Sequence, residues 1–399
     1  MTKALSNFQM DQLIRLRHDL HSQPELSGEE LNTAQRIISE LEQLGADEIV
    51  GGLGPWLEPD GNALGGTGVI AIFDSGKEGP SLLFRSELDG LPIEEISDLA
   101  YRSEVPTKAH LCGHDGHMSI LMGLAMRLQE QRPERGKVIL LFQPAEETGK
   151  GARALLADPA FQDHIPDMAF ALHNLPGLAL GEVGLKQGAM CCASRGIRIC
   201  LEGKTSHASM PQDGISPVGA LIAIAEGLAA MSNGLDEGQG LDDNYKLVTI
   251  THMTMGEPCF GVSPATGELW ATLRTVSDGA MDELVKSAHA LAKSEADRFK
   301  LYLELEEDDV FDACTNAQVT TEIVAKALKA EQIAIHELSD PMRWSEDFGR
   351  LGQHCHSTLF VLGSGEGHPQ LHNPDFDFPD ALIPIAVRVF ERIIRDQLG

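Results

Sequence analysis

The chain has 399 residues, 42% of them apolar, and its formal net charge is −29 because 60 acidic side chains outnumber 31 lysines and arginines. This length and apolar content suffice for two or three folded domains and exclude wholesale disorder. Binding to nucleic acid or to an anionic membrane requires basic patches, and the sequence has no run rich in lysine or arginine. We therefore exclude both functions.

Export and membrane insertion are not expected either. Residues 1–21 lack the apolar core of a signal peptide, and no apolar stretch reaches the roughly 18 residues that span a bilayer. The seven cysteines are scattered and odd in number, unlike the dense, even pattern of a disulfide-stapled secreted domain. These features predict reduced thiols and a cytoplasmic location.

Helices alternate with strands in the first half of the chain. In chain order we expect helices at 8–21 and 31–44, strands at 68–73 and 81–85, a helix at 118–131, a strand at 138–142, a helix at 151–157 and a strand at 167–172. This alternation predicts a layered α/β domain with a mostly parallel sheet.

The pattern changes near residue 188. Up to residue 299 we expect a strand, a helix, two strands and a helix, an order that fits a small α+β domain on an open antiparallel sheet. A final segment resumes helix and strand and ends in a helix over 381–398. The prediction is an α/β domain built from residues 1–187 and 300–399 and interrupted by a smaller domain at 188–299.

The segment from Cys112 to His117 is the strongest local signal for chemistry. Cys112 and His114 are two residues apart, so in an extended segment their side chains point the same way and can share a metal ion. The alternative is a triplet that occurs in a loop by chance. His117 is interpreted as a structural histidine.

Glu146 and Glu147 stand where a buried strand ends, which is where open α/β sheets place their ligand sites. Adjacent carboxylates can divide the work, because one ligates a metal while the other takes a proton from water and returns it to a leaving amine. A solvated turn with two surface acids is the alternative.

His173 follows a predicted strand, and His372 lies in a polar loop before the last helix. Each alone could be an ordinary hydrogen-bonded histidine. With Cys112, His114 and Glu147, however, they make five candidate ligands, more than one zinc ion needs. Five ligands suit two divalent ions about 3.5–4 Å apart, bridged by a thiolate or water, the geometry of metal-assisted hydrolysis.

These motifs resemble those of the dinuclear metallopeptidases of the aminoacylase and glutamate-carboxypeptidase family, peptidase family M20. The likeness is strongest to its amidohydrolase branch, which includes hippurate hydrolases, bacterial aminoacylases and plant auxin-conjugate hydrolases. It covers nearly the whole chain, from Arg17-His18-Asp19-Leu20-His21 to Leu371-His372-Asn373-Pro374. The resemblance implies a zinc-peptidase-like catalytic domain interrupted by a lid, or dimerisation, domain.

The resemblance also implies roles for single residues. It makes Cys112 the bridging metal ligand and Glu146 the general base, and it places Asp89 behind the metal site, where it would orient a ligand. The other implied ligands are His114, Glu147, His173 and His372.

The stretch Gly203-Lys204-Thr205-Ser206-His207-Ala208-Ser209-Met210-Pro211 is similar to the family's G-K-x-x-H-A-x-x-P signature in the lid domain. The resemblance implies that His207 stabilises the developing oxyanion, in many relatives from the partner subunit of a homodimer. Arg274 matches an arginine that helps to hold substrate. The bulky pair Arg343-Trp344 stands before the Ser-Glu-Asp-Phe core in place of the usual small residue and is a candidate for the acyl or carboxylate pocket.

Two departures from the family pattern affect the expected site. Glu87 stands where relatives usually carry aspartate, so the metal environment is altered there. Gly261 stands where many relatives carry an asparagine, so a substrate-facing amide is missing.

The expected activity is metal-dependent hydrolysis of the amide bond of N-acyl amino acids, which releases a carboxylate and a free amino acid. A dipeptidase or carboxypeptidase of the same family, a cysteine amidase with Cys112 as nucleophile, and a non-catalytic amino-acid-binding relative are the alternatives. Two divalent ions are the expected cofactors. A thiolate with imidazoles favours zinc, and manganese, cobalt and nickel stay open.

Overall fold

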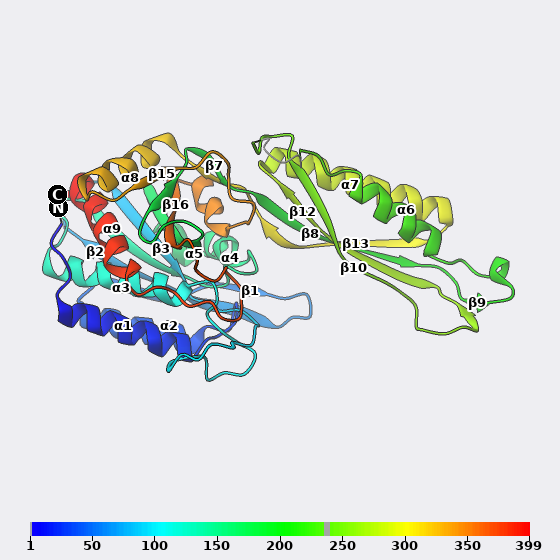
Figure 1. Cartoon of the computed structure of the whole chain (residues 1–399), viewed down its shortest axis with the longest axis horizontal. Coiled ribbons are helices and arrows are strands. Elements are labelled where there is room, and N and C mark those ends of the chain that lie inside the picture. Colours follow the sequence, from blue (N-terminus) through cyan, green and yellow to red (C-terminus); the bar gives the residue numbers. More distant parts are fainter. Residues whose placement is uncertain (1, 235–239) are drawn as a thin grey trace. The chain divides into compact units, whose positions relative to one another are not determined.

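The computed structural model describes residues 2–234 and 240–399, which form two compact units (Figure 1). The large unit comprises Met1–Met190, Cys314–Ser339 and Asp347–Gly399, and the small unit comprises Cys191–Ala313 and Asp340–Glu346. The small unit therefore extends past residue 299, the boundary that the sequence predicts. The reason is a strand that the sequence pattern does not reveal, β13 (Tyr302–Phe311), which pairs with β8 (Ala193–Glu202).

An eight-stranded sheet runs through the large unit in the order β1-β2-β4-β3-β5-β16-β6-β15. β4, β3, β5 and β16 are neighbours and run parallel, whereas β1 and β2 add an antiparallel edge. The expected α/β fold with a mostly parallel central sheet is thus confirmed. The strands are β1 (Glu48–Leu57), β2 (Ala63–Asp74), β3 (Ser81–Glu87), β4 (Lys137–Gln143), β5 (Met168–Pro176), β6 (Val183–Leu185), β15 (Ile335–Glu337) and β16 (His356–Gly365).

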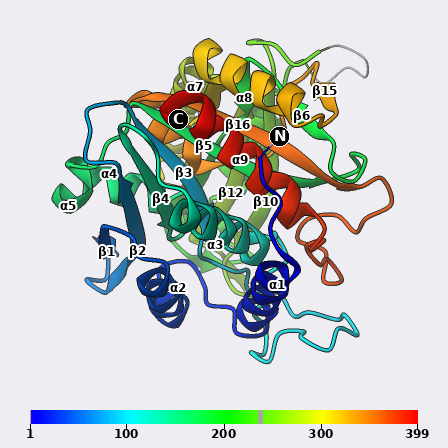
Figure 2. The same cartoon turned by 90° about the vertical axis from the view of Figure 1, so that its left-hand side faces the viewer.

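Helices cover both faces of this sheet. Figure 2 shows α1, α3 and α9 on the face turned to the viewer, and α4 and a 3₁₀ segment at Asp347–Gln353 pack on the other. Because each face is covered, the central strands β3 and β4 are buried almost from end to end, as their continuous apolar runs predict. The helices are α1 (Asn7–Ser22), α2 (Leu31–Gln43), α3 (His114–Glu130), α4 (Gly151–Ala157), α5 (Pro159–Gln162), α8 (Gln318–Ala330) and α9 (Leu382–Leu398).

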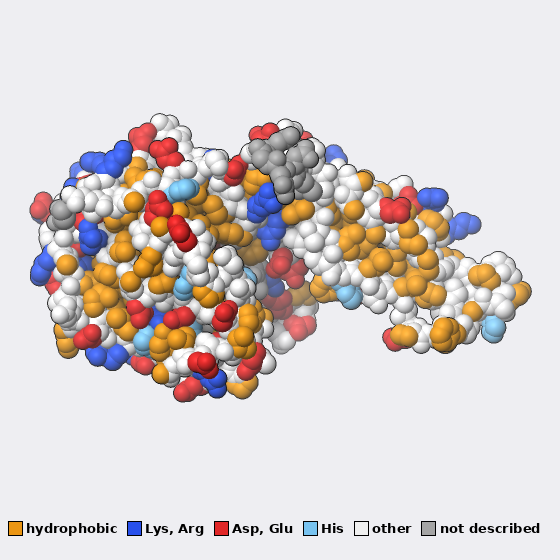
Figure 3. Space-filling model, in the orientation of Figure 1, with side chains coloured by type: hydrophobic (Ala, Val, Ile, Leu, Met, Phe, Trp, Pro, Cys, Tyr) orange, Lys and Arg blue, Asp and Glu red, His pale blue; other side chains and the backbone are white. Residues whose placement is uncertain are grey.

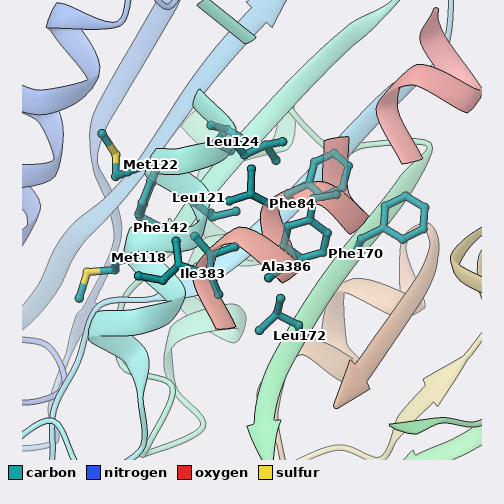
Figure 4. Close-up of a cluster of buried hydrophobic side chains, with 14 of the residues drawn as sticks. Phe84, Met118, Leu121, Met122, Leu124, Phe142, Phe170, Leu172, Ile383 and Ala386 are labelled. Atoms are coloured by element: carbon teal, nitrogen blue, oxygen red, sulfur yellow. The ribbon is translucent and has the colours of Figure 1, made fainter. Parts of the chain in front are cut away.

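The main core lies between the sheet and helices α3 and α9. Phe84 and Phe170 project from β3 and β5 toward Leu121 of α3 and Ile383 of α9 (Figure 4). All of these side chains are fully buried. α3 is apolar almost all round and is buried along most of its length, so its first residue, His114, is held in a rigid position.

The small unit is a four-stranded antiparallel sheet in the order β10-β12-β8-β13, with α6 (Val218–Ala229) and α7 (Asp278–Phe299) on one face. Burial alternates along β12 (Thr266–Thr275), as expected for a sheet with one covered face. β10 spans Lys246–Met255. The short strands β9 (Ser206–His207) and β11 (Val262–Ser263) pair with each other, and a 3₁₀ turn spans Pro211–Asp213. Another short pair, β7 (Gly188–Cys191) and β14 (Cys314–Asn316), belongs to the large unit except for Cys191.

The acidic excess is dispersed on the surface. On the face of the large unit drawn in Figure 3, aspartate and glutamate side chains are interspersed with lysines and arginines. Such a surface favours solubility and disfavours polyanionic partners. Among the described residues, no helix combines the length and the apolar character of a membrane span.

Candidate metal centre

The candidate ligands gather beside the carboxyl ends of three neighbouring strands of the large sheet. Glu87, the last residue of β3, is in register with Gln143, the last residue of β4, and His173 lies near the end of the adjacent strand β5. His173 lies within β5 rather than after it, because the strand continues to Pro176. The carboxyl ends of parallel strands are where α/β sheets bind ligands.

All five predicted ligands meet at this edge. The ligand atoms of Cys112, His114 and His173 lie within 4.8 Å of one another, and so do those of Cys112, Glu147 and His372. Cys112 is thus common to two groups. The carboxylate of Glu147 lies between them, with Oε1 3.8 Å from Nε2 of His114 and Oε2 3.6 Å from Nε2 of His372.

Hydrogen bonds to the backbone orient two of the imidazoles. Nδ1 of His114 donates to the backbone oxygen of Asp89 at 2.8 Å, and Nδ1 of His173 donates to the backbone oxygen of Asn174 at 2.8 Å. With the proton on Nδ1, the lone pair of Nε2 on each ring faces the cluster. This arrangement is typical of histidines that ligate metals.

The residues present fit a cation at this position. Nε2 of His114 is buried and has no hydrogen-bond partner among the described residues, although the carboxylates of Glu146 and Glu147 lie only 3.9 and 3.8 Å away. A buried lone pair that faces two carboxylates is unfavourable unless a positive charge lies between them. The donor set of one thiol, imidazoles and a carboxylate suits a pair of divalent ions.

The pKa shifts of His114 and Cys112 also indicate that the site favours positive charge. Burial opposes protonation of His114, but the hydrogen bond to Asp89 and the charge of nearby glutamates outweigh it and raise its pKa to about 10. Burial and the carboxylates of Glu147 and Glu146 raise the pKa of the Cys112 thiol well above its usual value. A thiolate at Cys112 is therefore unfavourable unless a cation lies next to it.

Glu146 and Glu147 are not in a solvated turn. Glu146 is only 5% exposed, and it follows Ala145, whose φ of 50° is unusual for a residue with a side chain. A buried carboxylate, Glu30, holds this turn: its Oε1 accepts from the backbone N–H of Ala145 at 2.8 Å, and its Oε2 accepts from the hydroxyl of Thr67 at 2.7 Å.

Glu30 is a residue that sequence reasoning missed, because its segment indicates only the start of a helix. Burial, together with the charge of Asp89, raises the pKa of Glu30 to about 7. The residue lies 115 positions before Ala145, so its contact depends on the fold rather than on a local motif. The only sequence signal was an acid next to the short loop that precedes α2.

Asp89 lies behind the cluster, as the family resemblance implies. Its Oδ2 accepts from the Ser27 hydroxyl at 2.7 Å and from the backbone N–H of Glu147 at 3.0 Å. Its backbone oxygen orients His114. Asp89 therefore contacts two of the five clustered residues without being one of them.

Glu87 and His117 form a pair beside His114. Nδ1 of His117 lies 2.6 Å from Oε2 of Glu87, and Nε2 of His117 accepts from the backbone N–H of Asn174 at 3.3 Å. Glu87 also bonds Arg85. Both ring nitrogens of His117 thus have partners. Glu87, His117 and His114 also have ligand atoms within 4.8 Å of one another, so the structural role of His117 stays a prediction.

His372 differs from the other four residues. It lies in the loop of residues 366–381, its side chain is 48% exposed, and its φ is 64°. Its backbone N–H donates to the backbone oxygen of Leu111 at 2.9 Å, which ties this loop to the segment that carries Cys112.

The remaining predicted residues belong to the small unit. His207 lies on β9 with its side chain exposed, and its Nδ1 is 2.8 Å from the hydroxyl of Ser209. Arg274, near the end of β12, donates to the backbone oxygen of Arg343 at 3.1 Å and to the hydroxyl of Ser345 at 2.9 Å. The fold thus brings Arg274 and Arg343 together.

Residues 83–396 match the model of peptidase family M20/M25/M40. The chain belongs to this family. The family resemblance seen in the sequence is therefore confirmed, and with it the assignment as a metal-dependent hydrolase of amide bonds.

Relatives of this M20 family member include deacetylases and amino acid hydrolases. N-acetyl-L-cysteine deacetylase of Bacillus subtilis is 31% identical over 374 residues, which cover 93% of this chain and 85% of the relative. IAA-amino acid hydrolase ILR1-like 5 of Arabidopsis thaliana is 27% identical, with 94% and 84% covered. The crystal structure of the Bacillus subtilis YXEP protein, described as a dinuclear metal binding peptidase, superposes with a TM-score of 0.80 at 26% identity and covers 99% of both chains.

Proposed function

We propose that this enzyme hydrolyses the amide bond of N-acyl amino acids and releases a carboxylate and a free amino acid. The observation that carries the proposal is the buried cluster in which Glu146 borders five candidate metal ligands, with Oε2 3.9 Å from Nε2 of His114. The names of the deacetylase and amino acid hydrolase relatives support this substrate class.

Five residues would hold two divalent metal ions, with Cys112 as the shared ligand, and they are Cys112, His114, Glu147, His173 and His372. When bound, the ions polarise the substrate carbonyl and acidify a water molecule. The mixture of thiolate, imidazole and carboxylate favours zinc, and manganese, cobalt or nickel are the alternatives. Asp89 keeps His114 and Glu147 in place.

Glu146 is the proposed general base. It removes a proton from the attacking water and later delivers a proton to the leaving amine. Because Glu30 fixes the turn at Ala145, the carboxylate of Glu146 is held in one place without a ligand-induced rearrangement of its backbone.

The small unit is proposed to act as a lid and to form a homodimer. His207 would stabilise the oxyanion, and its exposed position on β9 supports a role toward a group outside its own fold. Arg274 and Arg343 would hold the substrate carboxylate; the bond from Arg274 to the backbone oxygen of Arg343 keeps the two residues together, and the guanidinium of Arg343 lies over the ring of Tyr245. The scattered cysteines support a cytoplasmic location.

A cysteine amidase is the less favoured alternative. A nucleophilic cysteine needs a lowered pKa and a basic histidine nearby. Here burial and two carboxylates raise the pKa of Cys112, and burial lowers the pKa of the adjacent His173 to about 3. Both shifts oppose a thiolate–imidazolium pair.

The function is tested with a panel of N-acyl amino acids and dipeptides, assayed with metal-stripped enzyme and with zinc, manganese, cobalt or nickel added back. We expect chelator-sensitive release of free amino acid from N-acyl amino acids. Activity on dipeptides alone would indicate a peptidase, and chelator-resistant activity that thiol alkylation abolishes would indicate a cysteine amidase. Metal binding without turnover of any substrate would contradict the enzymatic proposal.

A further inference from the structure

We infer that Arg17, on α1, positions the loop of residues 366–381 and is required for tight binding of a metal ion at His372. This inference rests on the proposed role of His372 as a ligand. Arg17 bonds none of the five candidate ligands, all of which the structure describes, and would act on His372 only through the loop. It is therefore a positioning residue rather than a catalytic one.

The loop of residues 366–381 needs an anchor. It joins β16 to α9, all its residues are described, and it contains neither helix nor strand. His372 itself has a φ of 64°, a conformation that costs energy for a residue with a side chain. A ligand in such a loop keeps its position only if the surrounding contacts fix the backbone.

The backbone N–H of His372 already bonds the backbone oxygen of Leu111, and Arg17 provides a second anchor farther along the loop. It is completely buried, and its Nη1 donates to Oδ2 of Asp115 at 3.0 Å and to Oδ1 of Asp377 at 2.8 Å. Its Nε donates to Oδ1 of Asp380 at 2.5 Å. One planar guanidinium therefore joins three carboxylates, a geometry that lysine cannot reproduce.

These carboxylates come from both sides of the metal centre. Asp115 is the second residue of α3 and directly follows His114. Asp377 and Asp380 lie in the same loop as His372. Arg17 thus couples the start of the rigid helix α3 to the irregular loop that carries the exposed ligand.

The neighbouring groups make Arg17 hard to replace. Without it, Asp115 faces the two loop carboxylates across a site that has lost its guanidinium, and like charges at short range repel each other. Asp115 remains bonded to His21 at 2.9 Å and sits on a buried helix, so the loop is the part that moves. Tyr101 still donates to Asp377 at 2.8 Å, but a neutral hydroxyl does not compensate a charge.

Apolar contacts keep the loss of Arg17 from unfolding the loop entirely. Phe376 and Phe378 are fully buried, and the ring of Phe378 covers Gly116 on the first turn of α3 so closely that a Cβ at Gly116 would lie 2.3 Å from it. The loop should therefore stay attached to the protein while the position of His372 becomes imprecise. Metal affinity is the property that reports such a loss.

The experiment measures the binding of Zn²⁺ alone to metal-stripped, full-length protein by calorimetric titration and native mass spectrometry. We expect two ions in the wild type and one tightly bound ion in Arg17→Met, with the second ion weakened by about 10–100-fold, the effect typical of groups that orient metal ligands. His372→Ala should lose the same ion. Arg17→Lys should bind the second ion more tightly than Arg17→Met but less tightly than the wild type. Lysine keeps the positive charge but lacks the planar guanidinium that bonds several carboxylates at once.

Arg127→Met is the matched control. Arg127 is also buried and lies on α3, but at the opposite end, where it donates to both carboxylate oxygens of Glu391 on α9 at 2.9 and 3.1 Å. It should bind two ions with wild-type affinity. Asp377→Asn, a change at a partly exposed partner that keeps the side-chain size, provides a milder test if Arg17→Met does not fold.

The inference is overturned if the folded Arg17→Met variant binds both ions as tightly as the wild type. The same result with Asp377→Asn overturns it if Arg17→Met does not fold. Equal weakening in Arg127→Met overturns it too, because the effect would then reflect general destabilisation. A wild-type chain that binds fewer than two ions contradicts the proposed metal centre itself, an outcome that is recognised before any variant is compared.

Discussion

The candidate metal centre has two parts of different construction. The core part consists of Cys112, His114 and His173, which belong to the buried sheet edge and the start of α3, and none of them is more than 6% exposed. The loop part is His372, which lies on an irregular loop with its side chain 48% exposed. Glu147 lies between the core part and the loop part.

The difference shows how one site can combine rigidity with access. In the core part, backbone carbonyls at the ends of strands orient the imidazoles, so the geometry follows from the fold. In the loop part, ion pairs of Arg17 and the buried rings of Phe376 and Phe378 hold the loop that carries the half-exposed His372. We expect the core part to tolerate little change and the loop part to depend on Arg17.

We expect the largest effect, a loss of activity, from a substitution that changes neither the core part nor the loop part. Glu146→Gln removes the proposed base but no metal ligand, so kcat should fall by about 10²–10⁴-fold. Metal analysis should still find two ions per chain. If the variant instead loses metal, Glu146 belongs to the ligand set and the division into two parts is incomplete.

Cys112→Ala should weaken the binding of both metal ions, because Cys112 belongs to both groups of clustered residues. Removing a direct ligand should cost more than the roughly 100-fold in affinity that groups orienting a ligand can contribute. We expect fewer than one tightly bound ion in Cys112→Ala and one in His372→Ala, measured by mass spectrometry under native conditions. Equal stoichiometry in the two variants would contradict a shared role for the thiol.

The loop part is held by Arg17 and Asp115, and Asp115 also bonds His21. The charge of His21 predicts that the free energy of unfolding depends on pH. Burial disfavours charge on His21, but its bonds to Asp115 and Glu95 outweigh this and raise its pKa to about 9. A pKa raised above the unfolded value of about 6.5 stabilises the fold by up to about 3 kcal/mol below pH 6.5, and this contribution disappears as the pH rises through 9. The gap in free energy of unfolding between wild type and His21→Gln should therefore be larger at pH 6 than at pH 10. A constant gap in denaturant titrations would show that His21 does not change its charge.

We expect the smallest effect, a modest loss of zinc affinity, from a change at Asp89, which supports the core part. Asp89→Asn keeps the backbone oxygen that orients His114 but replaces the carboxylate that accepts from Ser27 and from the backbone of Glu147. We expect zinc affinity to fall by about tenfold, the lower end of the range for such groups. A loss as large as that of Cys112→Ala would mean that Asp89 is itself a ligand.

Cys112, His114 and Glu147 could be predicted because they stand in short local motifs, whereas His173 and His372 became candidates only through the complete set and the family resemblance. The Cys112-Gly113-His114 triplet precedes a buried helix, and Glu146 and Glu147 follow a continuous apolar strand. Their meeting point then follows from the rule that parallel strands end at the same edge.

The residues that support them could not be predicted in this way. Arg17 reaches Asp377 across 360 positions and Glu30 reaches Ala145 across 115, and neither pairing leaves a local pattern. β13 was missed for a different reason. Leu303 and Leu305 begin an alternation, but the run of acidic residues from Glu306 to Asp309 interrupts it.

The most direct test of the account is anomalous X-ray diffraction from crystals grown with zinc. We predict two peaks about 3.5–4 Å apart in the large unit, one beside His114 or His173 and one beside His372, with Cys112 in contact with both. A single peak, or peaks that Glu147 and Cys112 do not border, would contradict the dinuclear centre on which the proposed function depends.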